Sequence, residues 1–134
     1  MTRINLVPPE ELADQHLMAE YREMPMVPAA LRRSLKTRRV EDIKKGIPKE
    51  FTLNKGHVTF FYDKMAYLKK RYEIVCNELK ARGFKLDENR ALHIDNFPVG
   101  FYNDYEPDEA AYAIIRARIA ERVAMKPNWY RFTK

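Results

Sequence analysis

The chain has 134 residues, 46% of them hydrophobic, which is enough for one domain with a single core. No stretch approaches the roughly 18 apolar residues of a membrane span, and no charged and then apolar leader is present, so neither a membrane-spanning nor a secreted protein is expected. The formal net charge of +6 favours a polyanionic partner, nucleic acid first, although a merely soluble basic protein fits the charge equally well.

The first helix is predicted directly after a short extended arm. Pro8 and Pro9 end this N-terminal arm, and proline is well tolerated in the first turn of a helix. We predict a helix over residues 10–24, because its apolar residues recur on one side at about 100° per residue. That side carries Ala13, Leu17, Tyr21 and Met24. A neighbouring polar side carries His16, Glu20 and Glu23, and Arg22 points elsewhere.

Prolines interrupt the helical pattern after residue 24. Pro25 and Pro28 break or kink the first helix, because proline disrupts a helix interior. A short helix is expected over residues 29–35. Residues 36–56 are basic, lack a periodic apolar pattern and are predicted to form a loop.

Two longer helices are predicted in the second half of the chain. From residue 57 or 59 to residue 82, apolar side chains at i, i+3 and i+4 predict a long helix, and Gly83 stands where a C-terminal cap glycine belongs. Residues 84–106 are expected to be irregular. A further helix follows Pro107 and runs to about residue 125.

The last predicted helix is apolar on most of its sides. One side holds small residues suited to close packing: Ala110, Ala113, Ala117, Ala120 and Ala124. We therefore expect this helix to lie centrally, with Arg118 and Arg122 marking its one open side. The whole pattern predicts an all-α fold, a single compact domain over residues 1–134, with about three to four main helices and an extended N-terminal arm.

Residue counts argue against several kinds of site. Only 4 glycines are present, too few for a glycine-rich phosphate loop to be expected. The single cysteine, Cys76, cannot form an internal disulfide, which fits a reducing cytoplasm. One cysteine and three scattered histidines also argue against a zinc site.

Five stretches together point to a known family. They read MTRINL, ELADQHLMAEYRE, GHVTFFYDK, RGF and a closing P-x-WY. In these stretches, which span nearly the whole chain, the sequence resembles the pyrimidine-dimer DNA glycosylase/AP lyases, small UV-repair enzymes typified by endonuclease V of T-even bacteriophages. The resemblance implies a single all-α domain with its N-terminal arm threaded between helices, and a reaction that uses neither a metal nor an organic cofactor.

The resemblance also implies the catalytic groups. The expected nucleophile is the α-amine of Thr2, which is exposed when Met1 is removed. Glu23 is the expected second catalytic group. The alternative for Glu23 is a solvated charge at the end of a helix. An α-amine has an ordinary pKa near 7.7–8.0 against about 10.4 for lysine, so roughly 300-fold more of it is neutral at a given pH. Cations such as Arg3 and Arg22 are expected to lower that pKa further. The Thr2 side chain is small enough to permit Met1 removal.

Four arginines are expected to contact DNA phosphates. Arg3 and Arg22 are predicted to do so beside the catalytic groups. Arg118 and Arg122 stand where similar proteins carry basic DNA contacts. The alternative for all four is a solvated charge on the protein surface.

A histidine and an aromatic residue complete the predicted site. His16 is expected to hydrogen-bond a carboxylate or DNA, the alternative being a structural histidine. Of the tail residues Trp129 and Tyr130, Tyr130 is the expected DNA neighbour, because aromatic tails usually bury tryptophan first. A DNA contact is plausible chemically because aromatic planes stack on exposed bases. The alternative is that both rings close the core.

The chain departs from the family pattern beside Glu23. Similar enzymes continue with Leu-Pro-Arg-Val, where this chain has Met24-Pro25-Met26-Val27, and Pro28 replaces an aromatic position. Met26 cannot neutralise a phosphate, and Arg32, Arg33 or the basic residues 36–45 are candidates to replace that contact. Two alternatives to a pyrimidine-dimer enzyme therefore stay open: an AP lyase or glycosylase for a different damaged base, and a non-catalytic helical DNA-binding protein.

The expected partner is double-stranded DNA that contains UV lesions or abasic sites. No membrane partner is expected, and the protein is predicted to act as a monomer. Its expected location is the cytoplasm of a bacterium or of a phage-infected cell.

Overall fold

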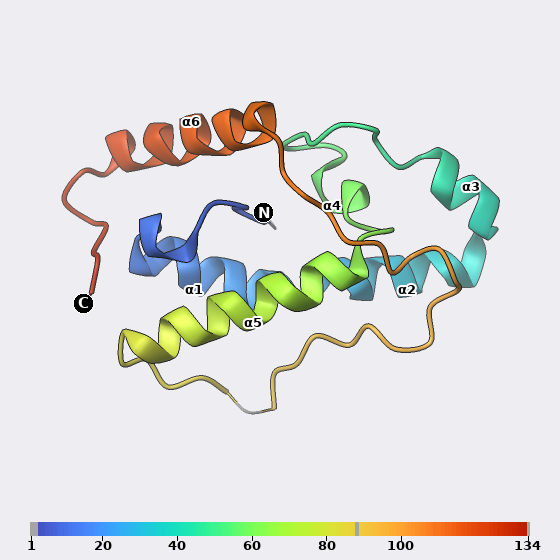
Figure 1. The fold of residues 1–134 in the computed structure, drawn as a ribbon, viewed down its shortest axis with the longest axis horizontal. Coiled ribbons are helices and arrows are strands. Elements are labelled where there is room, and N and C mark those ends of the chain that lie inside the picture. Colours follow the sequence, from blue (N-terminus) through green and yellow to red (C-terminus); the bar gives the residue numbers. More distant parts are fainter. Residues whose placement is uncertain (1–2, 88, 134) are drawn as a thin grey trace.

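Helices joined by irregular segments make up the fold (Figure 1), a computed structural model that describes residues 3–87 and 89–133. In chain order they are the 3₁₀ helix η1 (Pro9–Glu11) and the α-helices α1 (Asp14–Glu23), α2 (Met26–Thr37), α3 (Val40–Lys45), α4 (His57–Phe60), α5 (Met65–Ala81) and α6 (Glu109–Met125). The predicted all-α, single compact domain is confirmed. Within the described ranges, no helix is long and apolar enough to cross a membrane.

Helix α1 packs mainly against α5, and the contact between them forms the centre of the core. The predicted apolar side of α1 is confirmed, since these residues are at most 4% exposed: Ala13, Leu17, Tyr21 and Met24. The helix begins later than predicted, because the N–H of Asp14 donates to the carbonyl of Arg131 at 2.7 Å instead of to a carbonyl one turn earlier. The separate turn of η1 precedes it.

Helices α2 and α3 differ from the prediction in extent. Pro28 lies in the first turn of α2, where no helical N–H is needed, so the helix already begins at Met26. The predicted loop over residues 36–56 is wrong over α3. Ile43 anchors α3 in the core at 2% exposure, with acidic residues in its first turn and lysines in its last, as the helix dipole favours.

The long helix predicted from residue 57 or 59 is interrupted between α4 and α5. The N–H of Met65 donates to the carbonyl of Phe101 at 3.0 Å, and Lys64 forms an isolated bridge with Tyr102. These contacts draw the backbone away from helical geometry. The predicted cap is confirmed, because Gly83 has φ +92° and the N–H of Phe84 donates to the carbonyl of Leu79 at 3.0 Å.

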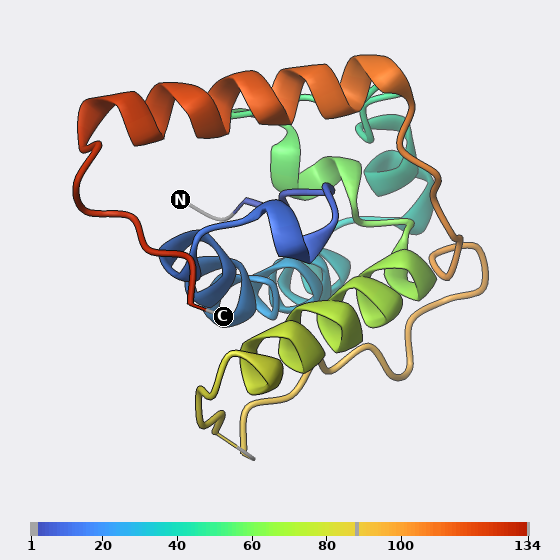
Figure 2. The ribbon, with the colours of Figure 1, turned by 60° about the vertical axis from the view of Figure 1, so that its left-hand side comes forward.

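Helix α6 lies along one side of the molecule, so its predicted central position is wrong (Figures 1 and 2). Only Ala111 and Ile115 of this helix are buried. Arg116 ties it to η1 through an ion pair with Glu11 at 2.8 Å. Small alanine side chains explain the error, because exposing them costs little hydrophobic free energy.

The predicted irregular segment 84–106 is confirmed over its described residues. It runs alongside α5 to the opposite end of the molecule and then turns up into α6 (Figure 1). Side chains from the helices hold it, as when Arg32 donates to the carbonyl of Asp95 at 2.9 Å. Lys70 likewise pairs with Asp104 at 2.7 Å.

Candidate active site

The N-terminal segment passes under α6 and beside α1 (Figure 2). Its residues from Ile4 to Val7 are at most 5% exposed, which is unusual burial for the start of a chain. The N–H of Ile4 donates to Nε2 of His57 at 2.8 Å. Because Nε2 accepts, Nδ1 of His57 carries the proton and donates to the carbonyl of Thr52 at 2.8 Å. Burial is the largest of the effects that lower the pKa of His57, and a lowered pKa favours the neutral ring.

A buried ion pair between α1 and α5 also holds this N-terminal segment in place. Arg71 of α5 donates to both carboxylate oxygens of Glu20 of α1, at 2.6 and 3.0 Å. Its Nη1 also donates to the carbonyls of Leu6 and Val7, at 3.2 and 2.6 Å. Arg71 and Glu20 are 4% and 1% exposed. Since breaking such a buried pair costs about 3–5 kcal/mol, the pair determines where the N-terminal segment lies.

A pocket of about 220 Å³ opens between this segment, α1, α6 and the C-terminal tail. Five of the residues predicted from the sequence line it: Arg3, His16, Glu23, Arg122 and Tyr130. Five others also line it: Asn5, Gln15, Ala19, Glu20 and Trp129. The predicted nucleophile, Thr2, lies outside the described residues.

Two carboxylates line the pocket, and only one is committed to hydrogen bonds. Glu20 is held by Arg71 and also accepts from the side chain of Asn5 at 3.0 Å. The carboxylate of Glu23 makes no hydrogen bond or ion pair with any residue in the described ranges. Its charge acts on Arg3, where it partly opposes the lowering of the guanidinium pKa that burial causes first. Glu23 is therefore the carboxylate available to a substrate.

Three arginines give the pocket a positive field. Burial first, and then repulsion from Arg122 and Arg118, hold the pKa of Arg3 below its ordinary value. Arg118 does not line the pocket, and it pairs with Glu121 of its own helix at 3.2 Å. A bound anion would relieve the repulsion among these guanidinium groups, so the arrangement favours a phosphate.

His16 and Tyr130 form an aromatic wall of the pocket. Their rings stack with centroids 4.6 Å apart at an interplanar angle of 16°. His16 is 5% exposed, and neither of its ring nitrogens has a hydrogen-bond partner among the described residues. The pKa of His16 is lowered to about 4, first by burial and then by the positive charge of Arg3. The charge of Glu20 opposes this lowering, and that of Arg122 adds to it. The ring is therefore neutral at pH 7 and can either donate or accept a hydrogen bond from the pocket.

The buried neutral His16 predicts a loss of stability in weak acid. Its pKa is about 4 when folded against about 6.5 unfolded, so its contribution to stability is complete above pH 6.5 and is lost as pH falls toward 4. Between pH 7.5 and 5 we expect the free energy of unfolding to fall by about 2 kcal/mol from this residue. Urea unfolding at the two pH values measures it.

Two variants isolate the contribution of His16 to this pH dependence. His16→Phe keeps an aromatic ring against Tyr130 and should flatten the slope. His93→Gln, at an exposed histidine, should leave the slope unchanged. A slope in His16→Phe as steep as in the parent protein would contradict the assignment.

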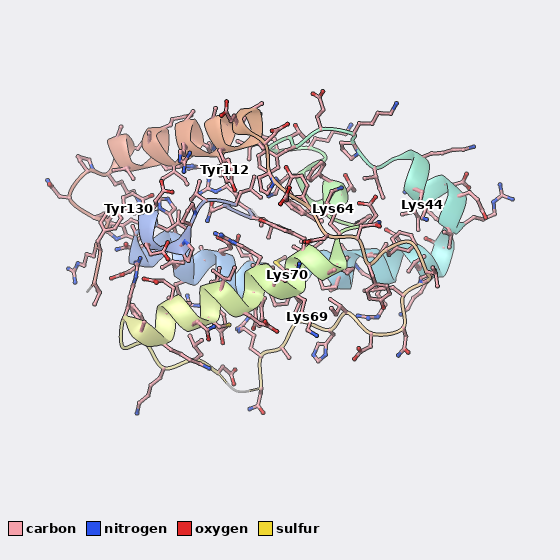
Figure 3. The ribbon with its side chains drawn as sticks, in the orientation of Figure 1. Lys44, Lys64, Lys69, Lys70, Tyr112 and Tyr130 are labelled. Carbon is pink, nitrogen blue, oxygen red and sulfur yellow. The ribbon has the colours of Figure 1, made fainter. Side chains whose placement is uncertain are left out.

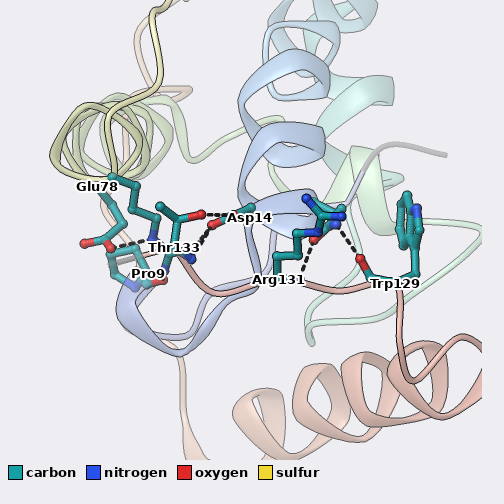
Figure 4. Close-up of polar contacts among 8 residues, drawn as sticks. Pro9, Asp14, Glu78, Trp129, Arg131 and Thr133 are labelled. Atoms are coloured by element: carbon teal, nitrogen blue, oxygen red, sulfur yellow. Dashed lines mark hydrogen bonds and ion pairs between the residues drawn. The ribbon is translucent and has the colours of Figure 1, made fainter.

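The tail that carries Tyr130 is clasped to the start of α1 (Figure 4). The side-chain amide of Gln15 donates to the carbonyl of Trp129 at 2.7 Å and accepts from the N–H of Arg131 at 3.0 Å. It therefore holds the backbone on both sides of Tyr130. In Figure 3 the labelled Tyr130 lies at the α1 end of the molecule and Lys44 of α3 at the opposite end.

Asp14 reinforces this clasp. Its carboxylate accepts from the backbone N–H and the hydroxyl of Thr133 and from Arg82, the residue that directly follows α5, the last at 2.9 Å. Desolvation raises the pKa of Asp14, but the hydrogen bonds from Thr133 and Arg82 outweigh it and hold this pKa below its ordinary value. Arg82 also donates to the carbonyl of Pro9 at 3.1 Å, so α5, η1 and the tail meet at Asp14 (Figure 4).

Three sequence expectations fit the site less directly. The expectation that Trp129 is buried before Tyr130 is wrong, because Trp129 is 52% exposed whereas Tyr130 stacks on His16. Arg22 is exposed and does not line the pocket. It borders a neighbouring hollow that also includes Trp129. Met26, at the start of α2, is 55% exposed.

Two pocket residues, Asn5 and Gln15, were missed from the sequence, and no local signal identifies them. Glu20 could have been found, since its helical spacing places it on the same side as His16 and Glu23. Across residues 3–87 and 89–133, no group of three or more His, Cys, Asp or Glu side chains is placed to hold a metal ion.

The chain matches the model of a known protein family. The model of the family described as pyrimidine dimer DNA glycosylase matches residues 1–92, more than half of the chain. The matched range includes Arg3, His16 and Glu23 of the pocket, whereas Arg122 and Tyr130 lie beyond it.

Proposed function

The chain belongs to the pyrimidine dimer DNA glycosylase family, and we propose that it excises UV-induced cyclobutane pyrimidine dimers and then cuts the strand as an AP lyase. Family membership makes it a DNA-repair glycosylase, an enzyme whose substrate is DNA. The observation that carries the finer proposal is the pocket in which Arg3, Glu23 and Arg122 converge beside the start of the chain.

The proposed nucleophile is the α-amine of Thr2. Its neutral lone pair attacks C1′ of the deoxyribose while the bond from C1′ to the base breaks, and the base takes up a proton. The bond from C1′ to O4′ then breaks, which opens the sugar ring. The attacking nitrogen gives up a proton and O4′ gains one, so that C1′ and the nitrogen are left joined as an imine. Thr2 directly precedes Arg3, which lines the pocket, and this supports an amine that acts there. Positive charge there disfavours the ammonium form and lowers the pKa of the amine, which supports a nucleophile that is neutral near pH 7.

Glu23 is proposed to act twice. As a carboxylate it stabilises the positive charge that develops on the sugar while the base departs. Once the imine has formed, the C2′ proton is acidic, and Glu23 accepts it. The electron pair left at C2′ then expels the 3′ phosphate by β-elimination. The lack of any bond from the Glu23 carboxylate to described protein groups supports both tasks.

The remaining pocket residues are proposed to bind the DNA. Arg3 and Arg122 contact phosphates, with Arg118 and Arg22 extending the basic surface on either side. Neutral His16 supplies a hydrogen bond, and Tyr130 presents its ring to the opened duplex. A glycosylase must unstack its target, and an aromatic wall next to the catalytic carboxylate compensates for part of that cost.

A narrower activity has one observation in its favour. Met26 occupies the position where similar enzymes carry an arginine, so one phosphate contact is missing beside α1. Loss of that contact weakens recognition of the dimer more than it affects the chemistry of the amine. The second candidate function is therefore an AP lyase, or a glycosylase for another damaged base, that uses the same pocket.

Borohydride trapping tests the proposal. A covalent protein–DNA adduct is expected on duplexes that contain a pyrimidine dimer or an abasic site, with the cross-link mapping to Thr2. An adduct on abasic DNA alone would select the second candidate function. No adduct on either duplex, with DNA binding preserved, would refute both catalytic mechanisms.

A further inference from the structure

The guanidinium of Arg3 is held by one side chain. Its Nε donates to Oδ1 of Asn5 at 3.0 Å, and Asn5 is 2% exposed. The other end of the Asn5 amide, Nδ2, donates to Oε1 of Glu20 at 3.0 Å. Asn5 therefore lies between a cation of the pocket and a buried carboxylate.

The orientation of the Asn5 amide follows from its neighbours. An ionised carboxylate only accepts hydrogen bonds, so the NH₂ group of Asn5 must face Glu20 and its carbonyl must face Arg3. Glu20 cannot rotate away, because Arg71 holds both of its oxygens. Arg71 is in turn held by the carbonyls of Leu6 and Val7. Three side chains in series, those of Arg71, Glu20 and Asn5, thus connect α5 to Arg3.

Arg3 needs such a restraint because its neighbours repel it. Burial is the first cause that lowers the pKa of Arg3, and the charges of Arg122 and Arg118 lower it further, so that both burial and repulsion disfavour a cation at that place. Without a partner, a flexible arginine would move away from this repulsion toward solvent. The bond to Asn5 uses Nε, and no described residue accepts a hydrogen bond from the other N–H groups of the guanidinium, which can donate to an anion.

We propose that Asn5 is a positioning residue, whose amide, oriented by the Glu20–Arg71 pair, holds Arg3 in the pocket against the repulsion of Arg122 and Arg118. This inference rests on the proposed function, since it takes Arg3 as a contact to DNA phosphate. Asn5 itself need not touch the DNA, because it acts through the place that it gives to Arg3.

A double-mutant cycle on DNA affinity tests the inference. The probe is a duplex with a tetrahydrofuran abasic-site analogue, which has no hydroxyl at C1′ and cannot form an imine. Asn5→Ala and Arg3→Ala should each weaken binding about tenfold, and the double variant should be no weaker than Arg3→Ala alone. Losses that multiply in the double variant would overturn the inference. Asn77→Ala, which removes an exposed amide on α5, should leave affinity unchanged.

The Asn5→Ala variant is expected to fold, because Oε1 of Glu20 keeps its bond from Arg71. A second measurement needs no variant. In the parent protein the NMR signal of the Arg3 Nε–H should be protected from exchange with water at neutral pH. Free exchange of that proton in the parent protein would overturn the inference.

The failure of this inference and the failure of the proposed function are distinguishable. A parent protein that gives no borohydride adduct refutes the imine mechanism. Multiplying losses in the affinity cycle, or an unprotected Arg3 Nε–H, refute only the role of Asn5.

Discussion

Replacing Glu23 by glutamine should abolish strand cleavage while DNA affinity stays within about twofold of the parent value. Glutamine keeps the size of the side chain but cannot accept the C2′ proton or stabilise a developing positive charge. Loss of a positioned proton acceptor typically costs about 10²–10⁴-fold in rate. Single-turnover cleavage of abasic-site DNA measures the rate, and fluorescence anisotropy with an uncleavable duplex measures the affinity.

Glu20 provides the matched control, because it is a second glutamate on the same helix and the same pocket. Glu20→Gln leaves the Arg71 guanidinium without a full counter-charge in a buried place, so it should lower the free energy of unfolding by about 3 kcal/mol or more. Glu23→Gln should leave unfolding nearly unchanged, since its carboxylate has no bond to the described residues. If Glu23→Gln lost affinity in proportion to rate, Glu23 would be a binding residue and not a catalytic one.

The sequence predicts the helices best where side chains alternate clearly between core and solvent. Leu17 and Tyr21 of α1 show this, as does the α5 pattern that ends at Gly83. It fails where backbone bonds to distant residues override local preference. The break at Lys64 depends on Phe101 and Tyr102, and the late start of α1 depends on Arg131. Such partners, dozens of residues away, leave no trace in a local pattern.

The peripheral position of α6 shows a different limit. The alanines on one side of this helix suggest close packing, but alanine is nearly as acceptable in water as in a core. Only Ala111 and Ile115 turn out to be buried. The side that faces the pocket is identified by Arg122, whose charge was predicted to mark an open side.

Some of the residues that line the pocket were named from the resemblance, although Arg22 and Arg118 were named as well and do not line it. Arg3, Glu23 and Arg122 come together as expected, from three separate parts of the chain. The clasp by Gln15 could not be inferred, because its partners in residues 129–131 become neighbours only after folding. The same holds for Asn5, whose amide is oriented by Glu20, a residue that becomes its neighbour only after folding.

Retaining Met1, or adding an N-terminal tag, should reduce borohydride trapping by about 100-fold or more. One added residue moves the chain's α-amine by about 3.8 Å, the spacing of consecutive Cα atoms. A displacement of about 1 Å at a reacting group can already cost about 100-fold. In addition, the former amine becomes an amide nitrogen and loses its nucleophilic lone pair. Trapping on abasic-site DNA, with the N-terminus verified by mass spectrometry, measures the effect.

A cleavable tag supplies the control within one preparation, since proteolysis that leaves Thr2 as the first residue should restore trapping. The restored protein should also form adducts well below the ordinary amine pKa of about 7.7–8.0, because Arg3 and its cationic neighbours disfavour the ammonium form. Neutral amine is lost as pH falls, so trapping should decline only once the pH passes below that lowered pKa. Full activity with an intact tag would require a lysine as nucleophile, and the burial of residues 4–7 would then serve stability alone.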